Sequence, residues 1–570
     1  LARFTDKIIL RENVGLDVWA YKTAMESYGW ERLAEFDEVV LFNATIMGPV
    51  YPFAEMYAEM AGRDVDFWGI TWFHEFPVDP FGTIEEGFIP RHIQSHFMAY
   101  RKSLVSSREF QEYWENLPEM HSYIDSVGRH EAPFTRRFER LGFTSDVYVN
   151  TEDMEGFTYQ PILFAPKKLI EEKRCPIFKR RSFFHPYDDV LDQSVGNATA
   201  DLYAYLRDHT DFDTDLIWNN ALRSMHMADI VKNLQLTYVL PTDVTDCDPS
   251  GAKVALVLHV YYLDLLEQTL GYARSMPEGC DIIVTVGSQE KAEAVREACE
   301  GLPYRVDVRV IENRGRDVSA LLVGVKDVIA DYDYVCFAHD KKVTQLEPYS
   351  KGEGFAVKCF ENILASREFV ANVIEQFEKE PRLGLLTPTP PNHADYFPIY
   401  SYGWSQNFVR TSRLLREMKL DVPLSPEKDV IAPLGTMFWF RPAALKPLFD
   451  MDWTYEDFPG EPNDNDGTLL HAVERAYGYV AQGSGYFAGW LYSDKFARIE
   501  LTNLSFYVQE LTRAIGYHWP ADTEMRMVHT LKEDNGLRRH VKEILRHTIP
   551  DRLHSPLRHL YDRTRRIVKK

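Results

Sequence analysis

The chain has 570 residues, of which 45% are hydrophobic and 26% are charged, and its formal net charge is −22. This length predicts more than one domain, and the acidic balance argues against nucleic acid as a partner. The sequence contains no long apolar run and no signal peptide, and its six cysteines form no CxxC pair. We therefore expect a cytoplasmic protein without a thiolate metal site.

The first elements in chain order are predicted within residues 7–50. They are a strand, a turn that contains Asn13, Gly15 and Asp17, an amphipathic helix and the strand DEVVLF. Only twelve residues precede Asn13. We expect this first domain, residues 1–150, to lack its opening β-α-β unit, and the natural chain to begin upstream.

Residues 151–250 form a predicted connector, with helices in ADLYAYLRDHT and TDLIWNNALRSM and a strand in LQLTYVL before a Pro/Asp/Gly linker. Residues 251–520 form the second predicted domain. It begins with the strand VALVLHVYY, the helix LLEQTLGYARSM and the strand CDIIVTVGS. Alternating strands and helices, with a continuously apolar first strand, predict an α/β fold whose parallel sheet has helices on both faces.

The second domain repeats the pattern of the first. Residues 305–343 again contain a strand, an Asn-x-Gly-x-Asp turn, a helix and a strand, so that Asn313, Gly315 and Asp317 match the residues of the first turn. Two further pairs of segments match in the same order, 92–114 with 433–453 and 129–149 with 463–483. Matches that keep their order along the chain indicate an internal duplication.

The last predicted segment, residues 521–570, is a basic helical tail. From Arg538 to Lys570 there are eleven Lys and Arg residues against three acidic ones, with apolar residues between them. One interpretation is a solvated tail. The other is an arm that holds the protein at the inner face of the cell membrane, where each basic residue near anionic lipid contributes about 1 kcal/mol.

Ligands of open α/β sheets bind beyond the carboxyl ends of the strands, so polar residues that follow strands are the site candidates. The turn of Asn313, Arg314, Gly315, Arg316 and Asp317 opens a helix. Free backbone N–H groups and two arginines in such a turn favour a diphosphate ligand. Capping of the helix by Asn or Asp is the alternative.

The next strand, YDYVCFA, is followed by His339, Asp340 and Lys341. Asp340 could hold Mg²⁺ or Mn²⁺ against a diphosphate, or the lysine could take the place of the metal. A single Asp beside a His leaves both alternatives open.

A third segment places Asp464 and Asp466 before the helix TLLHAVERAYGY. Glycosyl transfer with inversion needs a carboxylate that takes a proton from the acceptor hydroxyl, and either acid could supply it. An N-cap is the alternative for one of the two. On the acceptor side we place Trp404, Thr436 and Glu461.

These segments also resemble a known family. The strings ENRGRDV, HDKK, PRLGLLTPTPP, PLGTMFWFRPAAL and DFPGEPNDNDGTLLHAVER, and in the first half ENVGLDVWAYK, FDEVVLFNATIMGP and HIQSHFMAYRKS, are similar to the rhamnan synthesis F family. The resemblance implies two tandem GT-A-like domains, which have the Rossmann-like fold of nucleotide-diphospho-sugar transferases. It also implies a nucleotide-sugar donor, dTDP-L-rhamnose, and assembly of a bacterial cell-wall or O-antigen polysaccharide on a lipid-linked acceptor.

Carried over to this sequence, the resemblance implies that Asp317 and Asp340 lie at the donor site and that Asp466 is the catalytic base. Glu131 matches Asp466 in the first copy and could also catalyse. The first copy has Asn43 and no acid where the second has HDKK. The second domain is therefore the predicted donor-binding domain.

The leading hypothesis is an inverting rhamnosyltransferase, and two other functions stay open. A phosphosugar transferase would leave phosphodiester linkages in the polymer. A non-catalytic scaffold would bind sugars in the assembly complex without turnover.

Overall fold

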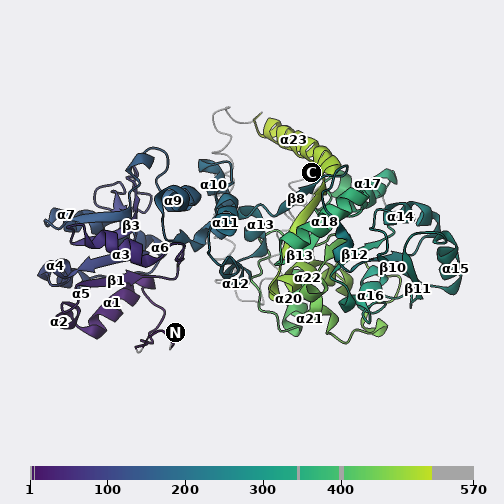
Figure 1. The fold of residues 1–570 in the computed structure, drawn as a ribbon, viewed down its shortest axis with the longest axis horizontal. Coiled ribbons are helices and arrows are strands. Elements are labelled where there is room, and N and C mark those ends of the chain that lie inside the picture. The colour runs from purple at the N-terminus through teal and green to yellow at the C-terminus, as the bar shows by residue number, and fades with distance from the viewer. Residues whose placement is uncertain (1–2, 6, 343–346, 397–402, 517–570) are drawn as a thin grey trace, which may run out of the picture. The chain divides into compact units, whose positions relative to one another are not determined.

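The computed structural model describes residues 3–5, 7–342, 347–396 and 403–516, and Figure 1 shows its fold. Contacts between residues divide the chain into two compact units, Leu1–Asp494 and Lys495–Lys570. The described part of the second unit lies in the helix α23 (Asp494–Gly516). The basic tail predicted at residues 521–570 lies outside the described residues. No helix in the described ranges is long and apolar enough to cross a bilayer.

The first β-sheet has mixed strand directions. Its longest strand, β3 (Phe67–Phe73), is almost wholly buried because FWGITWF is apolar at nearly every position. β5 (Phe97–Arg101) lies between β1 (Glu38–Phe42) and β3 and is antiparallel to both, whereas β6 (Ser145–Val149) is parallel to β3. The other elements here are β4 (His92–Ile93), α1 (Leu16–Tyr28), α2 (Trp30–Leu33), α3 (Phe53–Ala61), α4 (Lys102–Val105), α5 (Arg108–Glu115), α6 (Tyr123–Ser126), the π-helix η1 (Val127–Glu131) and α7 (Ala132–Arg140).

The connector contributes strands to two sheets. β7 (Phe178–Lys179) pairs with β2 (Ile46–Met47), and β8 (Thr237–Leu240) joins the large sheet. The two predicted helices are present as α11 (Ala198–His209) and α12 (Asp215–Ser224). The other connector elements are η2 (Glu152–Met154), α8 (Pro161–Phe164), α9 (Pro166–Lys173), η3 (Arg180–Phe183), α10 (Tyr187–Gln193) and α13 (Met227–Asn233).

The large sheet has eight strands in the order β11-β10-β9-β12-β14-β13-β15-β8. Neighbouring strands are parallel, except that β14 is antiparallel to β12 and β13. β9 is buried at every position, as expected for a sheet covered on both faces. The strand bounds are β9 (Val254–Val260), β10 (Asp281–Val286), β11 (Arg305–Val310), β12 (Tyr334–His339), β13 (Leu383–Pro388), β14 (Phe438–Phe440) and β15 (Phe487–Ser493).

The sequence predicts a parallel sheet, and the antiparallel β14 shows that this prediction was wrong for one strand. The chain leaves β13 at the carboxyl edge of the sheet and, after α20 (Phe408–Glu417), re-enters from the same edge. Only a strand that runs against its neighbours allows this path, since a parallel strand needs a crossover to the opposite edge. The fold is therefore α/β with mixed sheets.

Helices and short helical turns cover the large sheet and fill its connections (Figure 1). They are η4 (Pro249–Gly251), η5 (Leu263–Leu265), α14 (Leu266–Ala273), α15 (Gln289–Ala298), α16 (Arg316–Leu322), η6 (Ile329–Asp331), α17 (Ser350–Phe360), α18 (Arg367–Lys379), η7 (Ala394–Tyr396), η8 (Pro442–Leu445), α21 (Lys446–Phe449), η9 (Tyr455–Asp457) and α22 (Leu469–Gly483).

The same four-strand arrangement occurs in both sheets. β1-β5-β3-β6 and β12-β14-β13-β15 have the same order and the same strand directions. The pairing registers also correspond, because Val39 lies opposite Tyr100 and Val335 lies opposite Phe440. Tyr100 and Phe440 are matched positions of the sequence repeat, so matched segments occupy matched places in the two sheets.

Candidate active site

The turn between β11 and α16 is packed tightly against the segment that precedes α22. Gly315 and Arg316 have positive φ angles of 84° and 50°, and a Cβ at Gly315 would meet Phe458 at 2.7 Å, so only glycine fits. Arg314 Nε donates a 2.7 Å hydrogen bond to the carbonyl oxygen of Phe458. Arg314, which the sequence assigns to donor binding, therefore fixes this turn.

Arg316 adds an ion pair to the contact between this turn and the segment before α22. Its guanidinium reaches both carboxylate oxygens of Glu461, at 2.6 and 3.0 Å. Hydrogen bonds from Arg316 lower the pKa of Glu461. Glu461, predicted on the acceptor side, thus connects the turn between β11 and α16 to the segment before α22.

Most polar atoms of the turn after β12 make hydrogen bonds within the protein. The two ring nitrogens of His339 lie 2.8 Å from the carbonyl oxygens of Asp340 and Gly435. One carboxylate oxygen of Asp340 accepts hydrogen bonds from the backbone N–H groups of Tyr261 and Tyr262, at 2.8 and 2.5 Å. The other oxygen is buried without a partner among the described residues, and burial raises the pKa of Asp340.

Two adjacent lysines in this turn have different surroundings. The ammonium of Lys342 forms an ion pair of 2.6 Å with Asp264. The ammonium of Lys341 lies 4.3 Å from the centre of the Phe355 ring and has no carboxylate partner within the described ranges. The charge of Lys341 is therefore available to an anionic ligand.

A cavity of 130 Å³ lies where the two turns meet, beyond the carboxyl end of β12. This is the edge at which α/β sheets bind ligands. α22 contributes two further side chains to it, His471 and Glu474. The lining residues that the sequence predicts for the site are Arg316, Asp317, His339, Lys341 and Thr436.

The two α22 side chains are functional candidates that the sequence analysis missed. Glu474 accepts a 2.6 Å hydrogen bond from the backbone N–H of Gly435 and another of 2.6 Å from Arg475. The imidazole of His471 lies 2.8 Å from the hydroxyl oxygen of Thr468, and burial lowers the pKa of His471. The cavity therefore combines cations from the turns with a carboxylate and a neutral imidazole from the helix.

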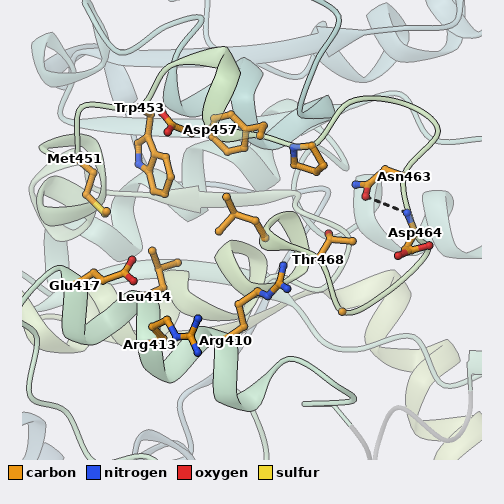
Figure 2. Close-up of a pocket in the computed structure, with 14 residues that line it drawn as sticks. Arg410, Arg413, Leu414, Glu417, Met451, Trp453, Asp457, Asn463, Asp464 and Thr468 are labelled. Carbon is orange, nitrogen blue, oxygen red and sulfur yellow. Dashed lines mark hydrogen bonds between the residues drawn. The ribbon is translucent and has the colours of Figure 1, made fainter.

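Asp464 and Asp466 lie outside this cavity. Asp464 borders a separate cavity of 760 Å³ (Figure 2), whereas Asp466 borders neither one. The carboxylate of Asp466 accepts a 2.7 Å hydrogen bond from the Asn407 amide and another from the Ser405 hydroxyl. Burial alone would raise the pKa of Asp466, but these hydrogen bonds outweigh it and lower the pKa to about 2. Of the three predicted loops, two meet at the small cavity.

Trp404 does not have the open position predicted for a sugar-binding ring. Its side chain is 6% exposed, its Nε1 donates a 2.9 Å hydrogen bond to the carbonyl of Lys428, and its ring stacks on Tyr479. The indole is part of the core, because both its edge and its face are occupied. Asn313 and Asn13 are exposed at the starts of their turns.

The first copy keeps the geometry of the turn. Gly15 and Leu16 have positive φ angles of 70° and 56°, as the matching pair does in the second copy. Asn43, which follows β1, donates a 2.6 Å hydrogen bond to Asp17. An amide therefore occupies the strand end that carries His339 in the second sheet.

The structure corrects the sequence match between Glu131 and Asp466. Glu131 accepts a 3.1 Å hydrogen bond from the backbone N–H of Ser95, and Ser95 precedes β5 at the position matched by Gly435 before β14. The carboxylate that accepts from Gly435 is that of Glu474. β6 pairs with β3 in the same register as β15 pairs with β13. When the two sheets are aligned by this register, Glu131 takes the position of Glu474.

Residues 1–486 match the model of the family described as rhamnan synthesis protein F. The chain belongs to this family. Two curated relatives, both named uncharacterized protein WxcX and from strains of Xanthomonas campestris pv. campestris, are 28% identical over 241 residues. The match covers 42% of this chain and 32% of theirs, so the chain spans about a third of the length of these relatives.

Among solved structures, the chain resembles S. aureus TarS (1–349), determined in complex with UDP and in a second crystal structure. Sequence identity is 11% and the TM-score is 0.23 in both comparisons. The similar region covers 42% of this chain and 57% or 60% of TarS.

No group of three His, Cys, Asp or Glu residues in the described part of the chain is arranged to hold a metal ion. Asp340 offers one carboxylate oxygen without a partner among the described residues, and Mg²⁺ in proteins is usually held by one or two carboxylates together with substrate phosphates. Lys341 is the cation of this lining that is left for an anion, because Arg316 is already paired with Glu461.

Replacing Asp466 by Ala should destabilise the fold by about 1 to 3 kcal/mol, because the fully buried Asn407 amide loses its acceptor. The pKa of Asp466 lies below its ordinary value of 3.8, so the carboxylate stabilises the fold above about pH 4 and this contribution is lost as the pH falls through about 2. Urea unfolding of wild type and variant at pH 7, 4 and 3 measures the difference. A difference that does not shrink with acid would contradict this role.

Proposed function

We propose that the chain is a glycosyltransferase that moves a sugar from a nucleoside-diphosphate donor to a growing bacterial polysaccharide, with dTDP-L-rhamnose as the favoured donor. Membership of the rhamnan synthesis protein F family supports this proposal. The observation that carries it is the small cavity in which Lys341 and Arg316 lie with the carboxylate of Glu474.

These side chains match the needs of sugar transfer. Lys341 offers an unpaired, compact positive charge suited to a diphosphate, whereas the guanidinium fork of Arg316 is held by Glu461. The cavity volume of 130 Å³ is below the about 300 to 1,000 Å³ of complete ligand sites. The cavity thus accommodates the reacting centre, with the nucleoside outside it.

We assign the role of general base to Glu474. Its carboxylate takes the proton from the acceptor hydroxyl, whose oxygen forms a bond to the anomeric carbon from the face opposite the diphosphate. The bond between that carbon and the diphosphate oxygen breaks, and Lys341 stabilises the charge on the leaving group. The products are the extended glycan with inverted configuration, the nucleoside diphosphate and one proton.

We also propose that both halves are GT-A-like domains and that the second binds the donor. The repeated four-strand arrangement supports the tandem organisation. Asn43 and the two residues after it include no lysine, and the ammonium near this strand end comes instead from Lys179, 3.4 Å from the Thr45 hydroxyl. The first copy does have a hydrogen-bonded carboxylate at the position of Glu474, that of Glu131.

We place the reaction in the cytoplasm, at the inner face of the membrane, on a lipid-linked acceptor. The basic composition of the segment from Arg538 to Lys570 supports peripheral membrane binding. The acidic remainder of the chain disfavours nucleic acid as a partner.

A panel of nucleotide sugars, each tested with and without Mn²⁺, tests the proposal. The true donor at about 100 times its dissociation constant should raise the free energy of unfolding by about 2.7 kcal/mol, which thermal unfolding detects. We expect the shift without added metal, because cationic side chains line the cavity. No shift with any donor would count against an enzyme. Phosphodiester linkages in the product would favour the phosphosugar transferase.

A further inference from the structure

The 760 Å³ cavity lies between α20 and the segment that leads from α21 to α22 (Figure 2). The proposed donor site does not use it. Its volume is in the range of about 300 to 1,000 Å³ that is typical of complete small-molecule sites. The side chains around it indicate which kind of ligand it fits.

α20 presents unpaired hydrogen-bond donors to this cavity. Arg410 and Arg413 lie on one face of the helix, and Figure 2 shows Arg410 extending from α20 toward Thr468. Neither guanidinium has a hydrogen bond or ion pair within the part of the chain that the structure describes. Each guanidinium carries five N–H donors that a ligand could use.

Free acceptors and a fixed aromatic ring border the same cavity. The carboxylates of Glu417 and Asp464 have no partner among the described residues. Trp453 donates a 2.9 Å hydrogen bond to the carbonyl of Leu448, and its ring lies 5.4 Å from that of Phe458. The indole is therefore held in one orientation and offers apolar surface to a ligand.

This combination points to an uncharged saccharide. Sugar hydroxyls both donate and accept hydrogen bonds, and the C–H face of a sugar ring packs on an aromatic surface. The two free carboxylates disfavour a phosphorylated or otherwise acidic chain, and the two arginines disfavour a cationic one. We propose that this cavity binds the acceptor glycan as an uncharged oligosaccharide, an inference that rests on the transferase function proposed above.

The position of the cavity supports this role. Thr468 and Leu469, at the start of α22, border the large cavity, and the next residues, Leu470 and His471, border the small one. A glycan in the large cavity would thus end beside the site where the donor sugar is expected. The carbonyl of Phe458, whose ring lines the large cavity, also accepts the hydrogen bond that fixes the donor turn.

The test uses the full chain with two probes, a neutral linear rhamnose trisaccharide and dTDP, each titrated by calorimetry. We expect the trisaccharide to bind wild type, and the double variant Arg410→Ala/Arg413→Ala to bind it about tenfold or more weakly with dTDP affinity unchanged. The control Arg416→Ala alters an arginine of the same helix outside the cavity, and should leave both affinities unchanged.

Four outcomes separate this proposal from the proposed function. If dTDP binds but the trisaccharide does not, or if the trisaccharide binds the double variant as well as wild type, the acceptor site is wrong and the transferase function stands. If the same trisaccharide carrying a phosphate binds tenfold more tightly than the neutral one, the uncharged class is wrong. If the trisaccharide binds wild type and dTDP does not, the donor assignment fails and the saccharide site stands.

Discussion

Replacement of Glu474 by Gln is expected to lower the rate of sugar transfer by about 10²- to 10⁴-fold without loss of nucleotide binding. Gln keeps the size of the side chain, and its carbonyl oxygen can still accept the hydrogen bond from the N–H of Gly435. The variant loses the ability to take a proton from the acceptor hydroxyl. Transfer of labelled sugar to membrane-bound acceptor gives the rate, and dTDP titration gives the binding.

Asp466→Asn is the variant to compare with Glu474→Gln. Asp466 lies outside the cavity and its carboxylate is held by Ser405 and Asn407, so we expect lower stability and a rate that changes by less than about tenfold. Loss of transfer in Asp466→Asn with normal transfer in Glu474→Gln would reverse the assignment of the base. Normal polymer synthesis in cells that carry Glu474→Gln would favour the non-catalytic scaffold.

The α/β class could be predicted because it depends on local patterns. A strand buried on both faces is apolar throughout, as β9 is, and the turns of the repeat carry glycines at positive φ. The direction of β14 could not be predicted, since it depends on the edge by which the chain returns to the sheet. Short strands after long irregular segments have no local signal for their direction.

The sequence match paired Glu131 with Asp466 instead of Glu474, because α22 contains one Gly-Tyr pair and a second follows it. Gly478 lies inside the helix, whereas Gly485 follows the helix end. Gly142 and Gly485 both have positive φ after their helices, and they follow Glu131 and Glu474 by the same number of residues. That spacing is the signal that could have identified Glu474.

The hydrogen-bond partners of individual side chains could not be predicted from the sequence. Arg314 resembles a phosphate ligand in its motif, yet it is bonded to backbone carbonyls of a segment more than a hundred residues away. SYGWSQN has the composition of a loop, but Trp404 within it is buried. Such contacts depend on which distant segments the fold brings together.

Lys341→Ala should weaken binding of the nucleotide sugar by about 10- to 100-fold, because a charge-assisted hydrogen bond contributes about 1.5 to 3 kcal/mol. Lys342→Ala is the matched control: it removes the same charge one residue away, from an ammonium already paired with Asp264. We expect it to change the affinity by less than about threefold, as surface ion pairs contribute little. Calorimetric titration with the donor at two salt concentrations measures both variants.

The salt dependence separates a direct contact from general attraction. A direct contact between Lys341 and the diphosphate predicts a large loss in that variant alone, most of it persisting at high salt because a partly buried pair is weakly screened. Equal losses in both variants that vanish at high salt would mean that the turn attracts the donor only at long range. A loss confined to Lys342→Ala would instead place the diphosphate in the 440 Å³ cavity between α14 and α17, which Lys342 borders together with Lys341. In that case the small cavity beside Glu474 would not be the site of transfer.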